Sequence, residues 1–189
     1  RAYTRREPRT LNRGGCFAMS TVSSRIVSVP LLALTALLLS GCGTVEHKVA
    51  LDQQYSVLPG TKVELGPVKN QTGQSFDIDG EKMLADAFSQ ALKDRNLQWT
   101  GGSTPRLVLT ADIVEYSKGD AFKRWLMPGW GSTVLVVRGA LDEVDNRKVG
   151  AVDAKRTVDA GGGYTIGAWE TIFRNVADDV ISKLAEQVK

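Results

Sequence analysis

An uncharged apolar run near the start of the chain decides how much of the sequence is available to fold. Residues 27–39 read VSVPLLALTALLL and follow Arg25 and the short stretch MSTVSS at residues 19–24. A basic start, an apolar core of about 7–15 residues and a small-residue cleavage point are typical of a secretory signal peptide. A membrane-spanning helix needs about 20 apolar residues, and Pro30 further weakens that alternative. We therefore expect residues 19–41 to be a signal peptide outside the folded domain.

The residues that end this run, Leu-Ser-Gly-Cys at 39–42, resemble the lipobox of bacterial lipoproteins, in which a small residue precedes an obligatory cysteine. The resemblance implies cleavage before Cys42, a diacylglycerol on its thiol, and acylation of the new amino terminus by a chain such as palmitate. Two or more acyl chains anchor a protein stably to a membrane. In that family an aspartate after the cysteine typically retains the protein in the inner membrane, so Gly43 implies the periplasmic face of the outer membrane. An ordinary cleavage site with an incidental cysteine is the alternative.

Removal of the leader changes the composition that matters. Residues 1–18 lack an initiator methionine, and we expect them to be an upstream extension outside the fold, with a basic interaction arm as the alternative. Six of the 24 basic residues and one of the 21 acidic residues lie within residues 1–41, so the remaining 148 residues carry 18 basic and 20 acidic side chains. Their net charge of −2 gives no nucleic-acid footprint. With Cys16 and Cys42 accounted for, the domain has no disulfide and no cysteine metal site.

Hydrophobic periodicity then predicts the elements. Residues 42–60 show no sustained pattern and are expected to form the lipidated tether, which would make the only histidine, His47, a solvated linker residue. Alternation predicts strands over residues 61–70, 105–119, 132–144 and 149–158. Three- and four-residue spacing predicts helices over 79–96 and 169–184, the first capped by Asp77 or Asp79. We therefore expect an α+β domain over residues 61–189. Its mainly antiparallel four-stranded sheet would carry two helices on one face, in the order strand-helix-strand-strand-strand-helix.

The stretch from 122 to 164, FKRWLMPGWGSTVLVVRGALDEVDNRKVGAVDAKRTVDAGGGY, precedes an amphipathic helix. This pattern resembles the bacterial lipoproteins grouped as domain of unknown function 4410, which share a lipobox, a glycine-containing loop before a long strand, and a glycine-rich loop before the last helix. Because that family has no established activity, the resemblance implies a cellular compartment and a fold rather than a mechanism.

The segment WLMPGWG at residues 125–131 is the main candidate binding site. Trp125, Leu126, Met127 and Trp130 surround a Pro-Gly turn between two predicted strands. Tryptophan is enriched at interface hot spots and at the headgroup level of membranes, so the loop is a candidate anchor for a partner or a membrane surface. The alternative is that these side chains fold back and cover the open end of the core.

Other motifs do not support a catalytic, cofactor or metal site. The glycine loop at 161–167 lacks the Lys-Ser/Thr of a phosphate loop, and DIDGE at 77–81 lacks ligands that an EF-hand requires. The carboxylates of Asp142, Glu143 and Asp145 are expected to be solvated at a turn. We therefore expect a non-enzymatic envelope lipoprotein with a protein partner. Binding of a small periplasmic ligand is the alternative, and a hydrolase with a Ser-Lys or carboxylate site has less support.

Overall fold

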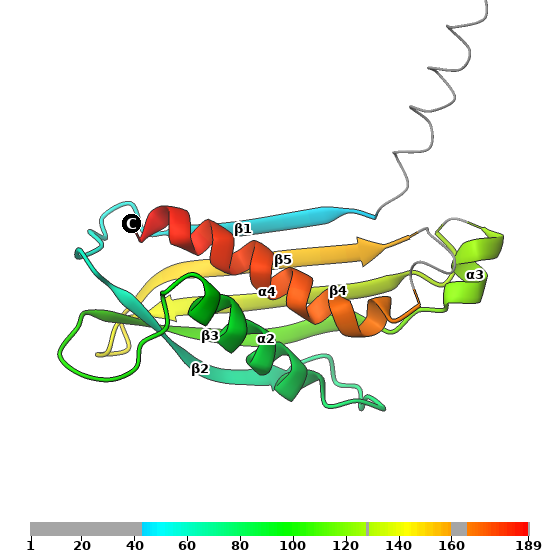
Figure 1. Cartoon of the computed structure of the whole chain (residues 1–189), viewed down its shortest axis with the longest axis horizontal. Coiled ribbons are helices and arrows are strands. Elements are labelled where there is room, and N and C mark those ends of the chain that lie inside the picture. The colour runs from blue at the N-terminus through cyan, green and yellow to red at the C-terminus, as the bar shows by residue number, and fades with distance from the viewer. Residues whose placement is uncertain (1–42, 128, 160–165, 189) are drawn as a thin grey trace, which may run out of the picture. The chain divides into compact units, whose positions relative to one another are not determined.

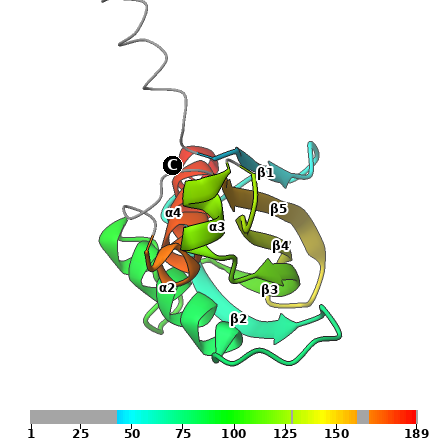
Figure 2. The same cartoon turned by 90° about the vertical axis from the view of Figure 1, so that its right-hand side faces the viewer.

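The computed structural model describes residues 43–127, 129–159 and 166–188. Within these ranges a five-stranded sheet carries helices α2 and α4 on one face (Figures 1 and 2). The α+β class is confirmed, but this part of the chain contains a fifth strand and a third helix that the sequence does not predict. The strands are β1 (Val45–Leu51), β2 (Lys62–Asn70), β3 (Arg106–Ser117), β4 (Thr133–Asp142) and β5 (Lys148–Val158); the helices are α2 (Gly80–Asp94), α3 (Ala121–Leu126) and α4 (Ala168–Gln187).

The order of strands in the sheet is β1-β5-β4-β3-β2. All neighbours are antiparallel except β2 and β3, which run parallel. Parallel neighbours require a crossover connection, and α2 supplies it. The pairing of β2 shifts register between Leu65 and Val68, where Gly66 and Pro67 stand. Because proline cannot donate to a strand ladder, it is found at a sheet edge or a bulge, and β2 satisfies both conditions.

The first strand corrects the predicted tether. β1 pairs with β5 along its whole length, from Val45 opposite Arg156 to Leu51 opposite Gly150. Its alternation is weak because β1 is an edge strand in which only Val49 is buried. The domain therefore begins almost directly after Gly43 rather than near residue 61, and His47 belongs to a strand rather than to a linker.

Helix α2 begins where its sequence predicts a capping residue. The Asp79 carboxylate accepts a hydrogen bond from the backbone N–H of Lys82 at 2.9 Å, which satisfies a donor that the helix itself leaves unpaired. Its apolar face buries Leu84, Phe88, Ala91 and Leu92 toward the sheet. A cap of this kind is worth about 1 kcal/mol, so the larger stabilisation comes from the buried face.

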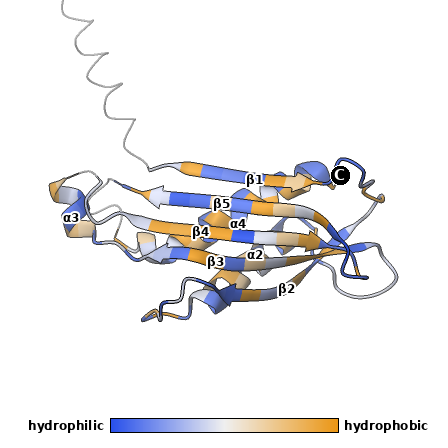
Figure 3. Cartoon of the chain, turned by 180° about the vertical axis from the view of Figure 1, so that it is seen from behind, coloured by the Kyte–Doolittle hydropathy of each residue, from blue (hydrophilic) through white to orange (hydrophobic). Residues whose placement is uncertain are grey.

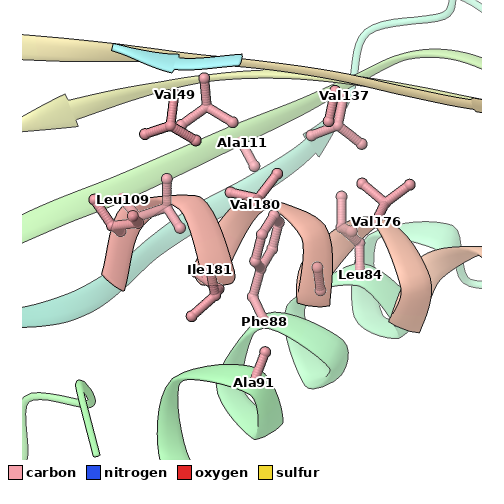
Figure 4. Close-up of a cluster of buried hydrophobic side chains, with 14 of the residues drawn as sticks. Val49, Leu84, Phe88, Ala91, Leu109, Ala111, Val137, Val176, Val180 and Ile181 are labelled. Carbon is pink, nitrogen blue, oxygen red and sulfur yellow. The ribbon is translucent and has the colours of Figure 1, made fainter. Parts of the chain in front are cut away.

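Helix α4 supplies most of the second layer. Seven residues of its predicted apolar stripe are at most 1% exposed, whereas Trp169, at the start of that stripe, is only half-buried. Figure 4 shows side chains of α4 meeting those of α2, β1, β3 and β4 in one cluster. Burial of one such aliphatic or aromatic side chain contributes about 1.5–3 kcal/mol. The seven are Ile172, Phe173, Val176, Ala177, Val180, Ile181 and Leu184.

The opposite face of the sheet carries no helix in the described part of the chain (Figure 3), and charged side chains such as Arg138 and Asp153 are exposed on it. One row runs straight across all five strands, and paired positions alternate in charge. Opposite charges on neighbouring strands stabilise a sheet modestly. Four of the five side chains in this row are exposed, and the fifth is half-buried. In strand order the row is Lys48, Asp153, Arg138, Asp112 and Lys69.

Candidate docking surface

The connection between β3 and β4 displays apolar side chains at one end of the sheet. It contains the short helix α3, which projects past the strand ends in Figure 1. Five of its large apolar side chains are between 55% and 66% exposed. Monomeric proteins rarely expose large apolar side chains that are grouped in one patch. We call these five side chains the apolar platform: Phe122, Trp125, Leu126, Met127 and Trp130.

This geometry decides between the two interpretations of the WLMPGWG segment. Trp125 and Trp130 point away from the core, so the idea that they cover its open end is wrong. Phe122, which lies outside the WLMPGWG segment, also belongs to the site. Phe122 stands three residues before Trp125 and four before Leu126, and residues at this spacing share one face of a helix. This spacing is the sequence signal that could have identified Phe122 as part of the site. The Phe122 and Trp125 rings lie 5.9 Å apart between centroids.

A buried arginine holds the platform on the sheet. Arg124 is only 3% exposed, although both of its neighbours in α3 are exposed. Its Nη1 donates to the carbonyl of Gly131 at 2.7 Å and to Oγ1 of Thr133 at 2.9 Å, and that hydroxyl donates to the carbonyl of Lys118 at 2.9 Å. Burial lowers the pKa of the Arg124 guanidinium, and the nearby carboxylate of Asp120 opposes this effect. The network joins α3 to the ends of β3 and β4.

The start of α3 is fixed by a cap and by close backbone packing. The Asp120 carboxylate accepts from the backbone N–H groups of Phe122 and Lys123 at 2.9 and 3.1 Å. The Asp120 N–H in turn donates to the carbonyl of Gly131 at 2.7 Å. Gly119 and Gly131 have φ of +67° and +69°, and a Cβ on either would approach a backbone oxygen to 2.8 Å or less. The apolar platform is therefore held on a defined frame rather than on a loose loop.

The platform lies at the end of the sheet where the described chain begins. The Thr157 N–H donates to the carbonyl of Thr44 at 2.9 Å, just before β1. Two residues further along, the carbonyl of Asp159 accepts from the N–H of Gly129, within the platform segment, also at 2.9 Å. The beginning of β1, the end of β5 and the platform segment are thus neighbours.

The remaining candidate residues have structural roles or lie outside the described ranges. Cys42 and most of the glycine loop at 161–167 are outside them. In the DIDGE segment, Asp77 forms an ion pair with Lys118 at 2.5 Å, Asp79 caps α2, and Glu81 accepts from the Asn70 N–H at 2.6 Å. Among the described residues, no group of three or more histidine, cysteine or acidic side chains is arranged to hold a metal ion.

The acidic turn between β4 and β5 is also structurally committed. Glu143 accepts from the Nε and Nη2 of Arg147, and the carboxylate of Asp145 accepts from the Arg147 N–H at 3.2 Å. Asp142 pairs with Lys148 in the β4–β5 ladder. The contacts of Glu143, Asp145 and Arg147 close the turn.

The structure gives limited support to binding of a small ligand between sheet and helices. That space is occupied by the buried core side chains (Figure 4). A shallow groove of about 280 Å³ lies instead over β1, β5 and β4, where charged side chains such as Arg138 and Asp153 form its lining. His47 borders this groove, and its Nδ1 is buried with no hydrogen-bond partner in the described structure.

Comparisons with known proteins identify structural neighbours only. No family model and no curated protein matches the chain, so the resemblance to domain of unknown function 4410 gains no support from them. The PelC dodecamer from Paraburkholderia phytofirmans is 16% identical with a TM-score of 0.52, over 78% of this chain and 99% of that one. A variant PelC dodecamer from the same organism is 17% identical with a TM-score of 0.52, over 78% and 98%.

A third neighbour is a Xanthomonas campestris protein of domain of unknown function 330, which is 14% identical with a TM-score of 0.42, over 72% of this chain and 88% of that one. At these identities the likeness to PelC establishes a shared fold. In the described part of the chain, none of the helices has the length and apolar character needed to cross a bilayer.

Proposed function

We propose that this chain is a lipid-anchored protein of the bacterial cell envelope, and that its α+β domain is a non-enzymatic docking module. The observation that carries the proposal is the apolar platform, in which five large apolar side chains are exposed on a frame that Arg124 and Asp120 hold in place. Large exposed apolar patches mark interaction sites. Trp125 and Trp130 are of the residue type most enriched at binding hot spots.

The anchor in this proposal is the acylated Cys42, with the outer membrane as its location because Gly43 follows it. β1 begins only three residues after Cys42, so the anchor would hold the folded domain close to the bilayer instead of on a long tether. Two or three acyl chains make such attachment stable. Cys42→Ala should leave the precursor unprocessed or the protein outside the membrane fraction, as measured by fractionation and by mass spectrometry of the amino terminus.

Photocrosslinking in intact cells tests the docking role. A photoreactive amino acid replaces Trp130, and a second strain carries it at Val144, an exposed residue in the turn between β4 and β5. Adducts at position 130 that are absent at position 144 would support docking through the platform. Equal and diffuse labelling at both positions, in correctly localised protein, would argue against it.

Assembly with further copies of the chain is a second proposed property. Its support is the shared fold with PelC, which forms a dodecamer, together with the β1 edge. The β2 edge is interrupted by Pro67, whereas β1 contains no proline along its seven residues and offers a regular edge for strand pairing. Light scattering coupled to size exclusion in mild detergent tests this property. A mass of one chain per particle across micromolar concentrations would refute it.

Ligand binding and hydrolysis have weaker support. Two of the candidate carboxylates have structural partners: Asp79 caps α2, and Glu143 forms an ion pair with Arg147. The domain has a single histidine, and it borders a shallow groove rather than an enclosed site. General acid–base catalysis needs a positioned partner for such a residue.

A further inference from the structure

We infer that the apolar platform docks on the lipid bilayer itself, as a second contact beside the lipid anchor. The inference rests on the proposed acylation of Cys42. It names the partner of the platform, which the proposed function leaves as an envelope component.

The described chain enters the domain beside the apolar platform. Thr44 is hydrogen-bonded to Thr157, near the end of β5, and Gly129 is hydrogen-bonded to Asp159, the residue directly after β5. Consecutive Cα atoms are 3.8 Å apart, and Cα atoms of hydrogen-bonded strand pairs are about 5.5 Å apart. These limits place the Cα of Cys42 at most about 13 Å from that of Thr157, and the bond to Gly129 lies only two residues further along. Acyl chains on Cys42 therefore hold the platform end of the domain at the membrane.

Most of the exposed large apolar side chains gather at the platform end of the domain. Nine large hydrophobic residues are exposed in the described chain, and seven of them belong to this end. Val45 opens β1 opposite Arg156. Ile166 lies two residues before α4, whose Trp169 carbonyl accepts from the Tyr116 hydroxyl near the end of β3. Only Leu58 and Val144 lie at the far end. The seven are Val45, Phe122, Trp125, Leu126, Met127, Trp130 and Ile166.

The residue types of the platform suit the surface of a bilayer. Tryptophan favours the headgroup level of a bilayer, where its ring is apolar and its N–H remains hydrated. Amphipathic helices bury their apolar face about 5–10 Å into that boundary. The six residues of α3 are too few to cross a bilayer but enough to lie in its surface, and exposed Lys123 beside them can approach anionic phospholipid headgroups.

A bilayer contact also gives a purpose to the hydrogen bonds that fix the platform to the sheet. Acyl chains alone hold a protein near a membrane but leave its orientation open. A second contact, fixed to the sheet through Arg124, would define which end of the domain faces away from the membrane. That distal end carries the Glu143–Arg147 turn and the exposed side chain of Val144.

The experiment places a fluorescent probe at the platform of the lipidated protein. The chain has only two cysteines, Cys16 and Cys42, so after signal cleavage and acylation an introduced thiol is unique. Leu126→Cys carries an environment-sensitive fluorophore, and Val144→Cys is the matched control, because both residues are more than half exposed in the native fold. Both proteins are purified in lipidated form and reconstituted into vesicles of phosphatidylethanolamine and phosphatidylglycerol.

If the platform inserts, the probe at position 126 shows blue-shifted emission and is quenched more by a nitroxide near the lipid headgroup than by one near the chain end. The probe at position 144 keeps aqueous emission. Adding Trp130→Asp to the position-126 variant should return the probe toward water while the protein still floats with the vesicles.

Two failures are distinguishable. Protein that does not float with vesicles, and has no acyl mass on Cys42, refutes the proposed anchoring. Protein that floats while the probes at 126 and 144 report the same aqueous environment overturns the bilayer contact and leaves the anchor intact. A specific protein adduct from position 130 in cells, combined with that aqueous emission, assigns the platform to a protein partner instead.

Discussion

The Nη1 of Arg124 donates to Oγ1 of Thr133 at 2.9 Å, and both side chains are almost completely buried. This hydrogen bond joins the inner side of α3 to the first residue of β4. It is one of the hydrogen bonds that attach the apolar platform to the core of the domain. Substitutions that break it should therefore disturb the platform before they disturb the sheet.

We expect Arg124→Met to lower the free energy of unfolding by about 2–3 kcal/mol, because hydrogen bonds from a charged donor are worth about 1.5–3 kcal/mol each and their buried acceptors lose a partner. Urea unfolding measures this loss, and amide exchange should rise most over residues 120–131. Lys123→Met is the control, because its side chain is exposed and the change should stay within about 0.5 kcal/mol. Equal effects of the two changes would contradict the role assigned to Arg124.

Gly131 and Gly60 provide a matched pair for the backbone of the platform. Both have positive φ, but a Cβ at Gly131 would meet the carbonyl oxygen of Asp120 at 2.8 Å, whereas a Cβ at Gly60 would meet nothing within 4 Å. Gly60→Ala should cost about 1 kcal/mol through backbone strain alone. Gly131→Ala should cost about 2–5 kcal/mol, because a steric clash is added to the same strain. Thermal unfolding of the two variants would contradict this account if their midpoints coincided.

The stability of the domain should fall in alkaline solution through Tyr116. Burial raises the pKa of its phenol to about 12, and the nearby carboxylate of Asp77 adds to the effect. The folded state therefore favours the neutral phenol, and its contribution is complete below pH of about 10, where the unfolded chain begins to ionise. It is lost as the pH rises toward about 12, by up to about 3 kcal/mol.

Tyr116→Phe isolates this effect from the other groups that titrate in the same range. Between pH of about 10 and 12 the free energy of unfolding should fall less steeply for the variant than for the native chain. Parallel pH profiles for the two proteins would show that the phenol ionises equally easily in both states.

The core elements were predictable because each buries one face with a regular period. The alternation of Leu107, Leu109, Ala111 and Ile113 in β3 is confirmed by complete or nearly complete burial of all four. The stripe of α4 is confirmed in the same way from Ile172 to Leu184. In both elements the physical cause, burial against a second layer, leaves its period in the sequence.

The two elements that hydrophobic periodicity does not predict, β1 and α3, bury few side chains of their own. β1 buries only Val49 and is specified by pairing with β5, a contact more than 90 residues away along the chain. α3 is six residues long, and the buried side chain that fixes it is an arginine. Hydrophobic patterns cannot indicate an element that is held by backbone pairing or by a buried cation. For the same reason the sequence could not decide whether Trp125 is exposed.

The last prediction separates the platform from the core by stability. Trp130 is 59% exposed, whereas Phe173 is 1% exposed and packs against Tyr116 with ring centroids 5.3 Å apart. Trp130→Ala should change the free energy of unfolding of the detergent-solubilised protein by less than about 0.5 kcal/mol, because it removes no buried contact. Phe173→Ala should cost about 3–5 kcal/mol. A loss of several kcal/mol from Trp130→Ala would mean that its ring packs as core in solution, and the apolar platform would then lose its principal member.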